Sequence, residues 1–169
     1  YGKRFSIENG IIFLRRNFDL SGSSNFNGVF LEDNADFGYV SYSFPTKGIV
    51  YIQLSSKSLL NTSVGASIDF YASAVNSKGK NDIIFQYSER AKWINGSILA
   101  NLGVEWRDTD YGTFYLGVGV NIPVTTIAVT NMKYYYDKAD ITKNDIYAPV
   151  FLNGNFFNIK IKYYLPENN

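Results

Sequence analysis

The chain has 169 residues, 16 Lys and Arg against 15 Asp and Glu, a net charge of +1, and neither His nor Cys. This length suits one domain with its own core, which we expect to cover residues 1–169. The balanced charge argues against nucleic acid as a partner. The missing Cys and His remove disulfides, zinc–thiolate sites, cysteine nucleophiles and Ser-His-Asp hydrolysis. We therefore expect no metal, no cofactor and no enzymatic activity.

Apolar and polar residues alternate with a period of two along most of the chain, and helical periodicity is nearly absent. The pattern predicts eight strands, in chain order at about 3–16, 37–44, 48–56, 62–75, 81–89, 96–106, 111–122 and 155–165. Short polar turns are expected on one rim at 45–47, 76–80 and 107–110. Long loops are expected at about 17–36 and 123–154. Inside the second loop, 126–136 and 146–152 are strand-like and would form either a projecting hairpin or two extra strands, ten in all.

The alternation places aliphatic residues on one strand face and small or polar residues on the other. In the strand 111–122, one face carries Phe114, Leu116, Val118, Val120 and Ile122, and the other carries Tyr115, Gly117, Gly119 and Asn121. The clean strands run to about 9–11 residues, which is the length that crosses a bilayer when tilted. Mid-strand glycines suit a cramped barrel interior better than a solvent face. Aromatic residues at strand ends, where a girdle would sit, are Trp106, Tyr163, Phe44 and Phe157. The aliphatic face is therefore predicted to meet lipid.

The segment Tyr111–Pro123, YGTFYLGVGVNIP, resembles a late strand of the small bacterial outer-membrane barrels of the OmpX and OmpA-transmembrane-domain kind. The alternating pattern extends this resemblance over most of residues 3–165, and the composition, rich in Asn, Lys, Ile and Tyr, is similar to that of small spirochaetal surface barrels. The resemblance implies an all-β fold, an eight-stranded antiparallel up-and-down transmembrane β-barrel in the bacterial outer membrane. Such a barrel would be a monomer in outer-membrane lipid, with periplasmic termini. The chain departs from many such barrels by continuing past Leu165, where they end on an aromatic residue.

Five charged residues on the polar faces would point into the lumen of such a barrel: Glu8, Asp69, Glu105, Lys160 and Lys162. The first and last strands of a closed barrel are neighbours, so Glu8 can reach Lys160 or Lys162. Burying a lone charge is costly, and these residues are therefore expected to form a salt-bridged network that closes the lumen. The alternative is a narrow pore.

The two long loops are the expected binding surface. The first carries Asp19, Glu32, Asp33 and Asp36 without Lys or Arg, and the last carries Lys133, Tyr134, Tyr135 and Tyr136. Tyrosine offers apolar area and a hydroxyl together, which favours contact with a protein. We expect a non-enzymatic surface protein, an adhesin or a binder of a host or neighbouring-cell protein; inert solvated loops are the other interpretation. The alternative class is a soluble β-barrel or sandwich, lipocalin-like, that binds a small apolar ligand in an aliphatic interior.

Overall fold

The computed structural model describes residues 4–26, 29–71, 74–81, 83–134 and 146–166, and the regular elements in these ranges are all β-strands. All the strand pairs are antiparallel. The strands are β1 (Phe5–Asn9), β2 (Ile12–Phe26), β3 (Val29–Gln53), β4 (Ser58–Tyr71), β5 (Val75–Lys78), β6 (Ile84–Arg90), β7 (Ile94–Asp108), β8 (Gly112–Pro123), β9 (Ala128–Tyr134), β10 (Ile146–Leu152) and β11 (Phe156–Tyr164). The expected all-β, antiparallel class is confirmed.

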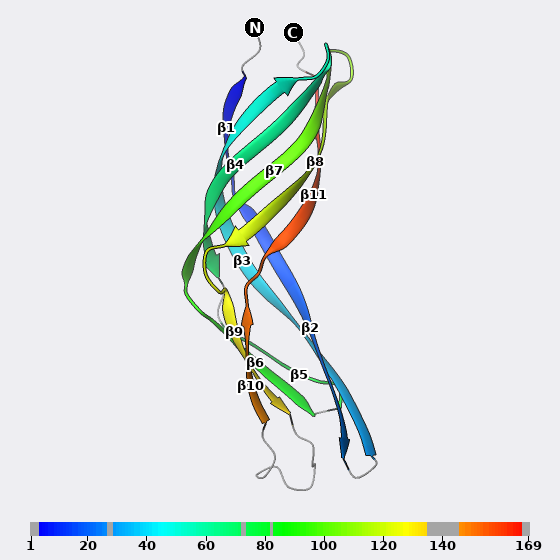
Figure 1. Cartoon of the computed structure of the whole chain (residues 1–169), viewed down its shortest axis with the longest axis vertical. Coiled ribbons are helices and arrows are strands. Elements are labelled where there is room, and N and C mark those ends of the chain that lie inside the picture. The colour runs from blue at the N-terminus through cyan, green and yellow to red at the C-terminus, as the bar shows by residue number, and fades with distance from the viewer. Residues whose placement is uncertain (1–3, 27–28, 72–73, 82, 135–145, 167–169) are drawn as a thin grey trace.

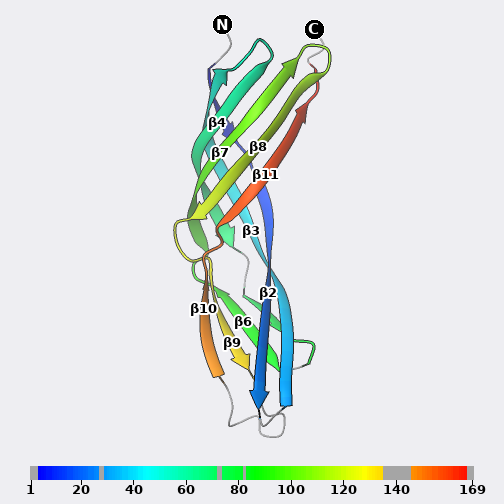
Figure 2. The ribbon, with the colours of Figure 1, turned by 45° about the vertical axis from the view of Figure 1, so that its right-hand side comes forward.

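The strands form two sheets that lie end to end in an elongated molecule (Figure 1). The terminal half, beside the two chain ends, contains the order β1-β3-β4-β7-β8-β11, and the distal half contains β10-β9-β6-β5. β2 pairs with β3 and carries their hairpin into the distal half. Figure 2 shows the same division, with β4, β7, β8 and β11 in one half and β6, β9 and β10 in the other. The chain thus passes repeatedly along the length of the molecule. Each pass is one strand or a pair of successive strands: β1–β2, β3, β4–β5, β6–β7, β8–β9 and β10–β11.

The predicted loop at 17–36 is wrong, because these residues form most of β2 and the first part of β3. Their pairing runs from Phe26↔Val29 to Ile12↔Ser43 and continues in the same register in β1, from Asn9↔Thr46. Asp, Asn and Ser on the solvent side of this hairpin hide the alternation, while Phe18 and Phe37 stack on its inner side, with ring centroids 5.3 Å apart.

The predicted turn at 45–47 is also wrong, and 37–44 and 48–56 belong to the single strand β3. Pro45 faces the break between β1 and β2, where the ladder needs no N–H from it, and its carbonyl accepts a hydrogen bond from the Gly10 N–H at 3.3 Å. Proline is tolerated in a strand only at such a place. Most of the turn predicted at 76–80 belongs to β5, and the turn comes after Lys78. This turn and the one near 107–110 lie at opposite ends of the molecule rather than on one rim (Figure 1).

The segments 126–136 and 146–152 contain the hairpin β9–β10, which was one of the two expected forms. The expected count of eight barrel strands is wrong, because six strands cross the terminal half and its sheet is not closed by pairing within the described ranges. β1 and β11 are its two edges. The short strands predicted from the sequence are joined through the molecule into longer paths, which leaves fewer strands side by side.

In the terminal half, aliphatic side chains face outward and polar or small ones face inward, which is the reverse of a soluble sheet. On β8, Val118 is 58 % exposed, whereas the neighbouring Gly119 is buried. The same holds across the sheet, where the exposed aliphatic residues include Val64, Ile68, Ile98, Leu102, Leu116, Ile159 and Ile161. The inner side is mainly polar, and it is closely packed at Gly103: a Cβ there would lie 2.7 Å from the Tyr115 ring, so only glycine fits beneath that ring.

The hydrophobic core lies where the two halves meet. It is formed by residues of β3, the end of β4, the start of β9 with the residue before it, and the end of β10: Phe37, Tyr39, Tyr71, Ile127, Ala128 and Leu152. Tyr39 and Ile127 are fully buried. This junction cluster separates the polar interior of the terminal half from the distal half.

Candidate functional site

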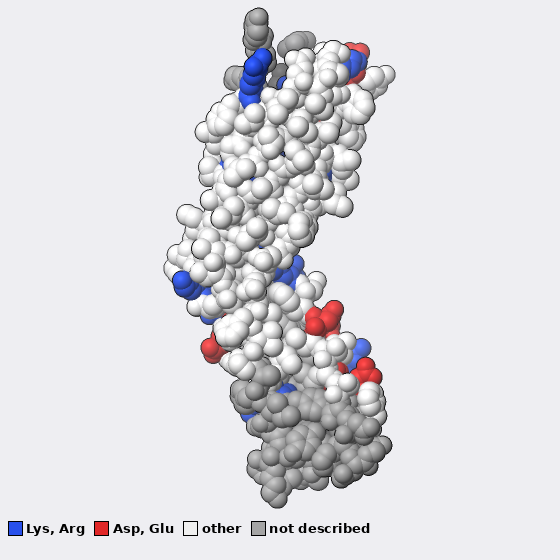
Figure 3. All heavy atoms as spheres, viewed as in Figure 1, with Lys and Arg blue, Asp and Glu red and all other residues white. Residues whose placement is uncertain are grey.

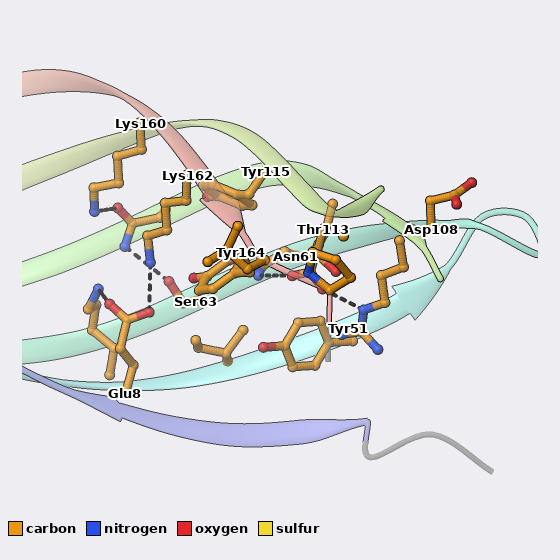
Figure 4. Close-up of a pocket in the computed structure, with 18 of the residues that line it drawn as sticks. Glu8, Tyr51, Asn61, Ser63, Asp108, Thr113, Tyr115, Lys160, Lys162 and Tyr164 are labelled. Atoms are coloured by element: carbon orange, nitrogen blue, oxygen red, sulfur yellow. Dashed lines mark hydrogen bonds and ion pairs between the residues drawn. The ribbon is translucent and has the colours of Figure 1, made fainter. Parts of the chain in front are cut away.

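The interior of the terminal half contains a polar cavity of about 610 Å³. Its walls come from β1, β3, β4, β7, β8 and β11, so the curled sheet surrounds it although its edges are unpaired. Asp108, Thr113 and Tyr164 line its end at the terminal rim, and Glu8, Lys160 and Lys162 lie at its inner end (Figure 4). The cavity therefore opens beside the chain termini and points toward the junction cluster.

Glu8 bridges the two edges of the sheet. Its carboxylate accepts hydrogen bonds from Lys47 Nζ at 2.6 Å and from Lys162 Nζ at 3.0 Å, which joins β1 to β3 and to β11. The Lys47 side chain is only 7 % exposed. Sequence reasoning missed Lys47 by placing it in a turn, although it continues the buried alternation of Ser41, Ser43 and Ile49. We refer to Glu8, Lys47 and Lys162 as the edge bridge.

The five predicted lumen charges all lie on the inner face, but they form separate groups rather than one network. Glu105 accepts a hydrogen bond from Arg107 Nε at 2.6 Å near the rim. Lys160 donates to the side-chain oxygen of Asn101, a neutral partner. Asp69 lies deeper, outside the cavity lining, and accepts hydrogen bonds from Ser67 Oγ, at 2.9 Å, and Ser97 Oγ.

Arg16 is a second inner cation that the sequence pattern did not single out; it is the last residue of the strand predicted at 3–16. It donates to Ser41 Oγ at 2.9 Å, and its guanidinium carbon lies 5.2 Å from the centroid of the Phe156 ring. These contacts connect β2 to β3 and β11 near the junction. The Arg16 side chain therefore makes a second contact between the two edges of the sheet, closer to the junction than the edge bridge.

Three of the predicted binding residues lie on the exposed side of the β2–β3 hairpin: Asp19, Glu32 and Asp36. Asp19 and Asp36 are direct cross-strand partners. Like charges in this arrangement repel each other and destabilise a hairpin. Lys133 is half-buried on β9. The side chain of Tyr134, and all of Tyr135 and Tyr136, lie outside the described residues.

Asp33 is not a surface residue, which corrects its assignment to a binding loop. It is 2 % exposed and accepts hydrogen bonds of 2.9 or 3.0 Å from the backbone N–H groups of Asn34, Asn81, Ile83 and Ile84. Burial alone would raise the pKa of this carboxyl, but the four donors favour its anion and lower the pKa to about 2. Asp33 thus fixes the turn between β5 and β6 to β3, over a sequence separation that no local pattern reveals.

Known proteins do not identify this site. No known protein family, curated protein or solved structure matches the chain. Among the described residues, there is no group of three or more metal-ligating side chains that could hold a metal ion. No helix long and apolar enough to cross a membrane occurs in those residues either.

Replacing Asp33 with Ala should loosen the β5–β6 turn, because three backbone N–H groups lose a charged acceptor in a buried place. We expect a local loss of about 2 kcal/mol, and therefore roughly thirtyfold faster tryptic cleavage at Lys80. Glu32→Ala, an exposed change on the same strand opposite the uncharged Ser23, is the matched control and should leave the cleavage rate unchanged. The stabilisation by Asp33 should be complete above about pH 4 and disappear as the pH falls through about 2; equal cleavage of the two variants would contradict this role.

Proposed function

We propose that this chain is a non-enzymatic integral protein of a bacterial outer membrane, whose terminal half crosses the bilayer as a curled β-sheet and whose distal half projects to bind a partner. The proposal rests on the outward-facing aliphatic side chains of the terminal half. A soluble sheet turns its aliphatic residues inward, whereas here they lie outside and Ser, Asn, Lys and Glu lie inside. A lipid environment favours this arrangement, because its apolar chains accept the exposed side chains without cost.

On the side seen in Figure 3, the outer face of the terminal half is nearly free of charge between its two ends. The charges of this half either point inward, as Glu8, Lys47, Asp69, Glu105, Lys160 and Lys162 do, or lie at its margins. Arg4, Lys57 and Asp108 mark the terminal margin, and Arg15, Arg90 and Lys92 mark the junction margin. A charge in the middle of a bilayer is costly, and this distribution avoids that cost.

The two Trp residues of the chain lie at the two margins of this apolar band. Trp93 immediately precedes β7 and Trp106 is near its end; both are 60 % exposed. At about 3.3 Å per residue the stretch between them is about 43 Å long. A strand tilted by about 35–45°, as in outer-membrane barrels, would rise about 30–35 Å over it. This height matches a hydrocarbon core of about 30 Å, with an indole at each interface.

Other aromatic residues gather at the same two levels. Phe114 and Tyr163 pack at the terminal margin with ring centroids 5.0 Å apart. At the junction margin, Phe70 contacts Phe44 at 5.6 Å and Trp93 at 5.8 Å between centroids. Aromatic rings favour the membrane–water interface because they are apolar and polarisable at once. The two aromatic levels therefore support the same placement as the tryptophans.

A membrane location requires the edges β1 and β11 to find partners, because lipid satisfies no backbone N–H or C=O group. The edge bridge and the Arg16–Phe156 contact already bring the two edges together. The alternating directions of the paired strands make β1 and β11 antiparallel. Pairing them would close the sheet without reversing any strand.

The alternatives fit the interior less well. An aliphatic ligand pocket of the lipocalin kind requires aliphatic residues to face inward, but this cavity is lined by Lys, Glu, Asn and Tyr. A pore requires a polar path through the molecule, and the junction cluster of Tyr39, Tyr71 and Ile127 interrupts it. A cavity closed at one end is the better description.

The distal half supports the binding part of the proposal through the acidic β2–β3 hairpin. The opposed pair Asp19 and Asp36 weakens the hairpin that carries it, so stability does not explain its presence. Exposed carboxylates on a projecting hairpin suit a basic surface on a host or neighbouring-cell protein.

Tryptophan quenching tests the membrane part of the proposal. The variants Trp93→Phe and Trp106→Phe each leave one reporter in the full chain reconstituted in phosphatidylcholine vesicles. Both remaining tryptophans should be quenched more by lipids brominated near the headgroup than by lipids brominated near the chain ends. Quenching of both by aqueous iodide, with no effect of brominated lipid, would overturn the proposal.

Neutralising the acidic pair tests the binding part. The double variant Asp19→Asn, Asp36→Asn should bind a Lys-rich peptide at least tenfold more weakly than the wild type, in titrations at low salt, because the attraction is electrostatic. It should also be slightly more stable, because the repulsion is gone. Asp110→Asn removes a charge at the terminal rim and is the control; an equal loss of binding in this control would refute the assignment.

A further inference from the structure

The inner end of the cavity contains more positive than negative charge. Lys47, Lys160 and Lys162 all line it, together with the single carboxylate of Glu8. Glu8 bonds to both Lys47 and Lys162, so one negative charge is shared by two ammonium groups. Among the described residues, Lys160 bonds only to the Asn101 amide; the charges of Lys47 and Lys162 repel it, and that of Glu8 attracts it.

The other charges of the cavity do not compensate this excess. Glu105 is engaged by Arg107 at 2.6 Å, and Asp108 by Lys57 at 2.5 Å. Both pairs lie toward the rim and are neutral overall. Asp69 is outside the cavity lining and is held by Ser67 and Ser97. Uncompensated charge inside a narrow, partly desolvated space is costly, and a bound anion would remove that cost.

We propose that the inner end of the cavity is a binding site for a small oxyanion, a phosphate or carboxylate group, held between Lys160 and the edge bridge. Lysine ammonium groups recognise such oxygens as point charges, and Lys160 has donors left beyond its bond to Asn101. The cavity volume of about 610 Å³ leaves room for the group and for hydration water. The ligand enters from the terminal rim, where the cavity opens.

Tyrosines along the entry favour an anion carried on a larger polar molecule. Tyr51, Tyr115 and Tyr164 line the path between the rim and the lysines. Arg107 lies 5.2 Å from the centroid of Tyr51, and Lys162 lies 5.7 Å from that of Tyr115, so both rings are paired with cations. Their hydroxyls and faces suit the uncharged part of a ligand such as a sugar or a headgroup. The proposal concerns the cavity alone and holds whether or not the outer face meets lipid.

Thermal unfolding of the full chain in a zwitterionic detergent tests the site, with inorganic phosphate and acetate as separate probes against chloride, at fixed pH and ionic strength. At least one probe should raise Tm saturably, since a ligand that binds the folded state stabilises it. Lys160→Met should abolish that rise and be more stable than the wild type in chloride. Lys160→Arg should keep the rise, and Lys92→Met, a matched change at an exposed position, should leave it unchanged.

The two probes also identify the ligand chemistry. A rise with phosphate alone assigns a phosphate site, and a rise with acetate alone assigns a carboxylate site. No saturable rise with either probe, or the same rise in Lys160→Met, would overturn the proposal. Where phosphate raises Tm, line broadening of its ³¹P NMR signal provides a measurement on the wild type that does not depend on the folding of any variant; broadening that grows linearly with protein and never saturates would count against a phosphate site.

Discussion

The structure depends on one geometric constraint: successive side chains of a β-strand point to opposite faces of the sheet. In the terminal half this constraint divides the sequence into a mainly aliphatic outer face and a mainly polar inner face, with Ile49 and Leu99 as aliphatic residues on the inner side. Val118 beside Gly119, and Ile161 between Lys160 and Lys162, show the division one residue at a time. The polar face of the terminal half is the inner one. This orientation accounts for the inner charges, the glycines under Tyr115, the cavity and the edge bridge.

The alternation predicted the faces and the positions of several strands, because both are local properties. The predicted strands at 96–106, 111–122 and 155–165 correspond to β7, β8 and β11 within a few residues. The strand order across the sheet and the length of the β2–β3 hairpin are not local. The hairpin is polar on its outer side and is stabilised by contacts such as Phe18 on Phe37, so its sequence resembles a loop.

The site was partly predictable for the same reason. The alternation along each strand placed Glu8, Lys160 and Lys162 on inner faces. Alternation within a strand cannot show which residues meet across strands. Lys47 was missed because Pro45 suggested a turn, and Asp33 was misplaced because its partners at Asn81, Ile83 and Ile84 are about fifty positions away. Long-range pairing decides both cases, and only the folded structure reveals it.

The central claim is that the apolar outer face of the terminal half is in contact with lipid. Val118 in mid-band and Val124 just beyond β8 allow a direct comparison, because their exposed fractions are 58 % and 66 %. In lipid vesicles, Val118→Arg should lower the free energy of unfolding by about 2–4 kcal/mol and Val124→Arg by about 0–1 kcal/mol. Equal, small effects of the two substitutions in chemical denaturation would contradict the claim, since an exposed arginine is harmless in water.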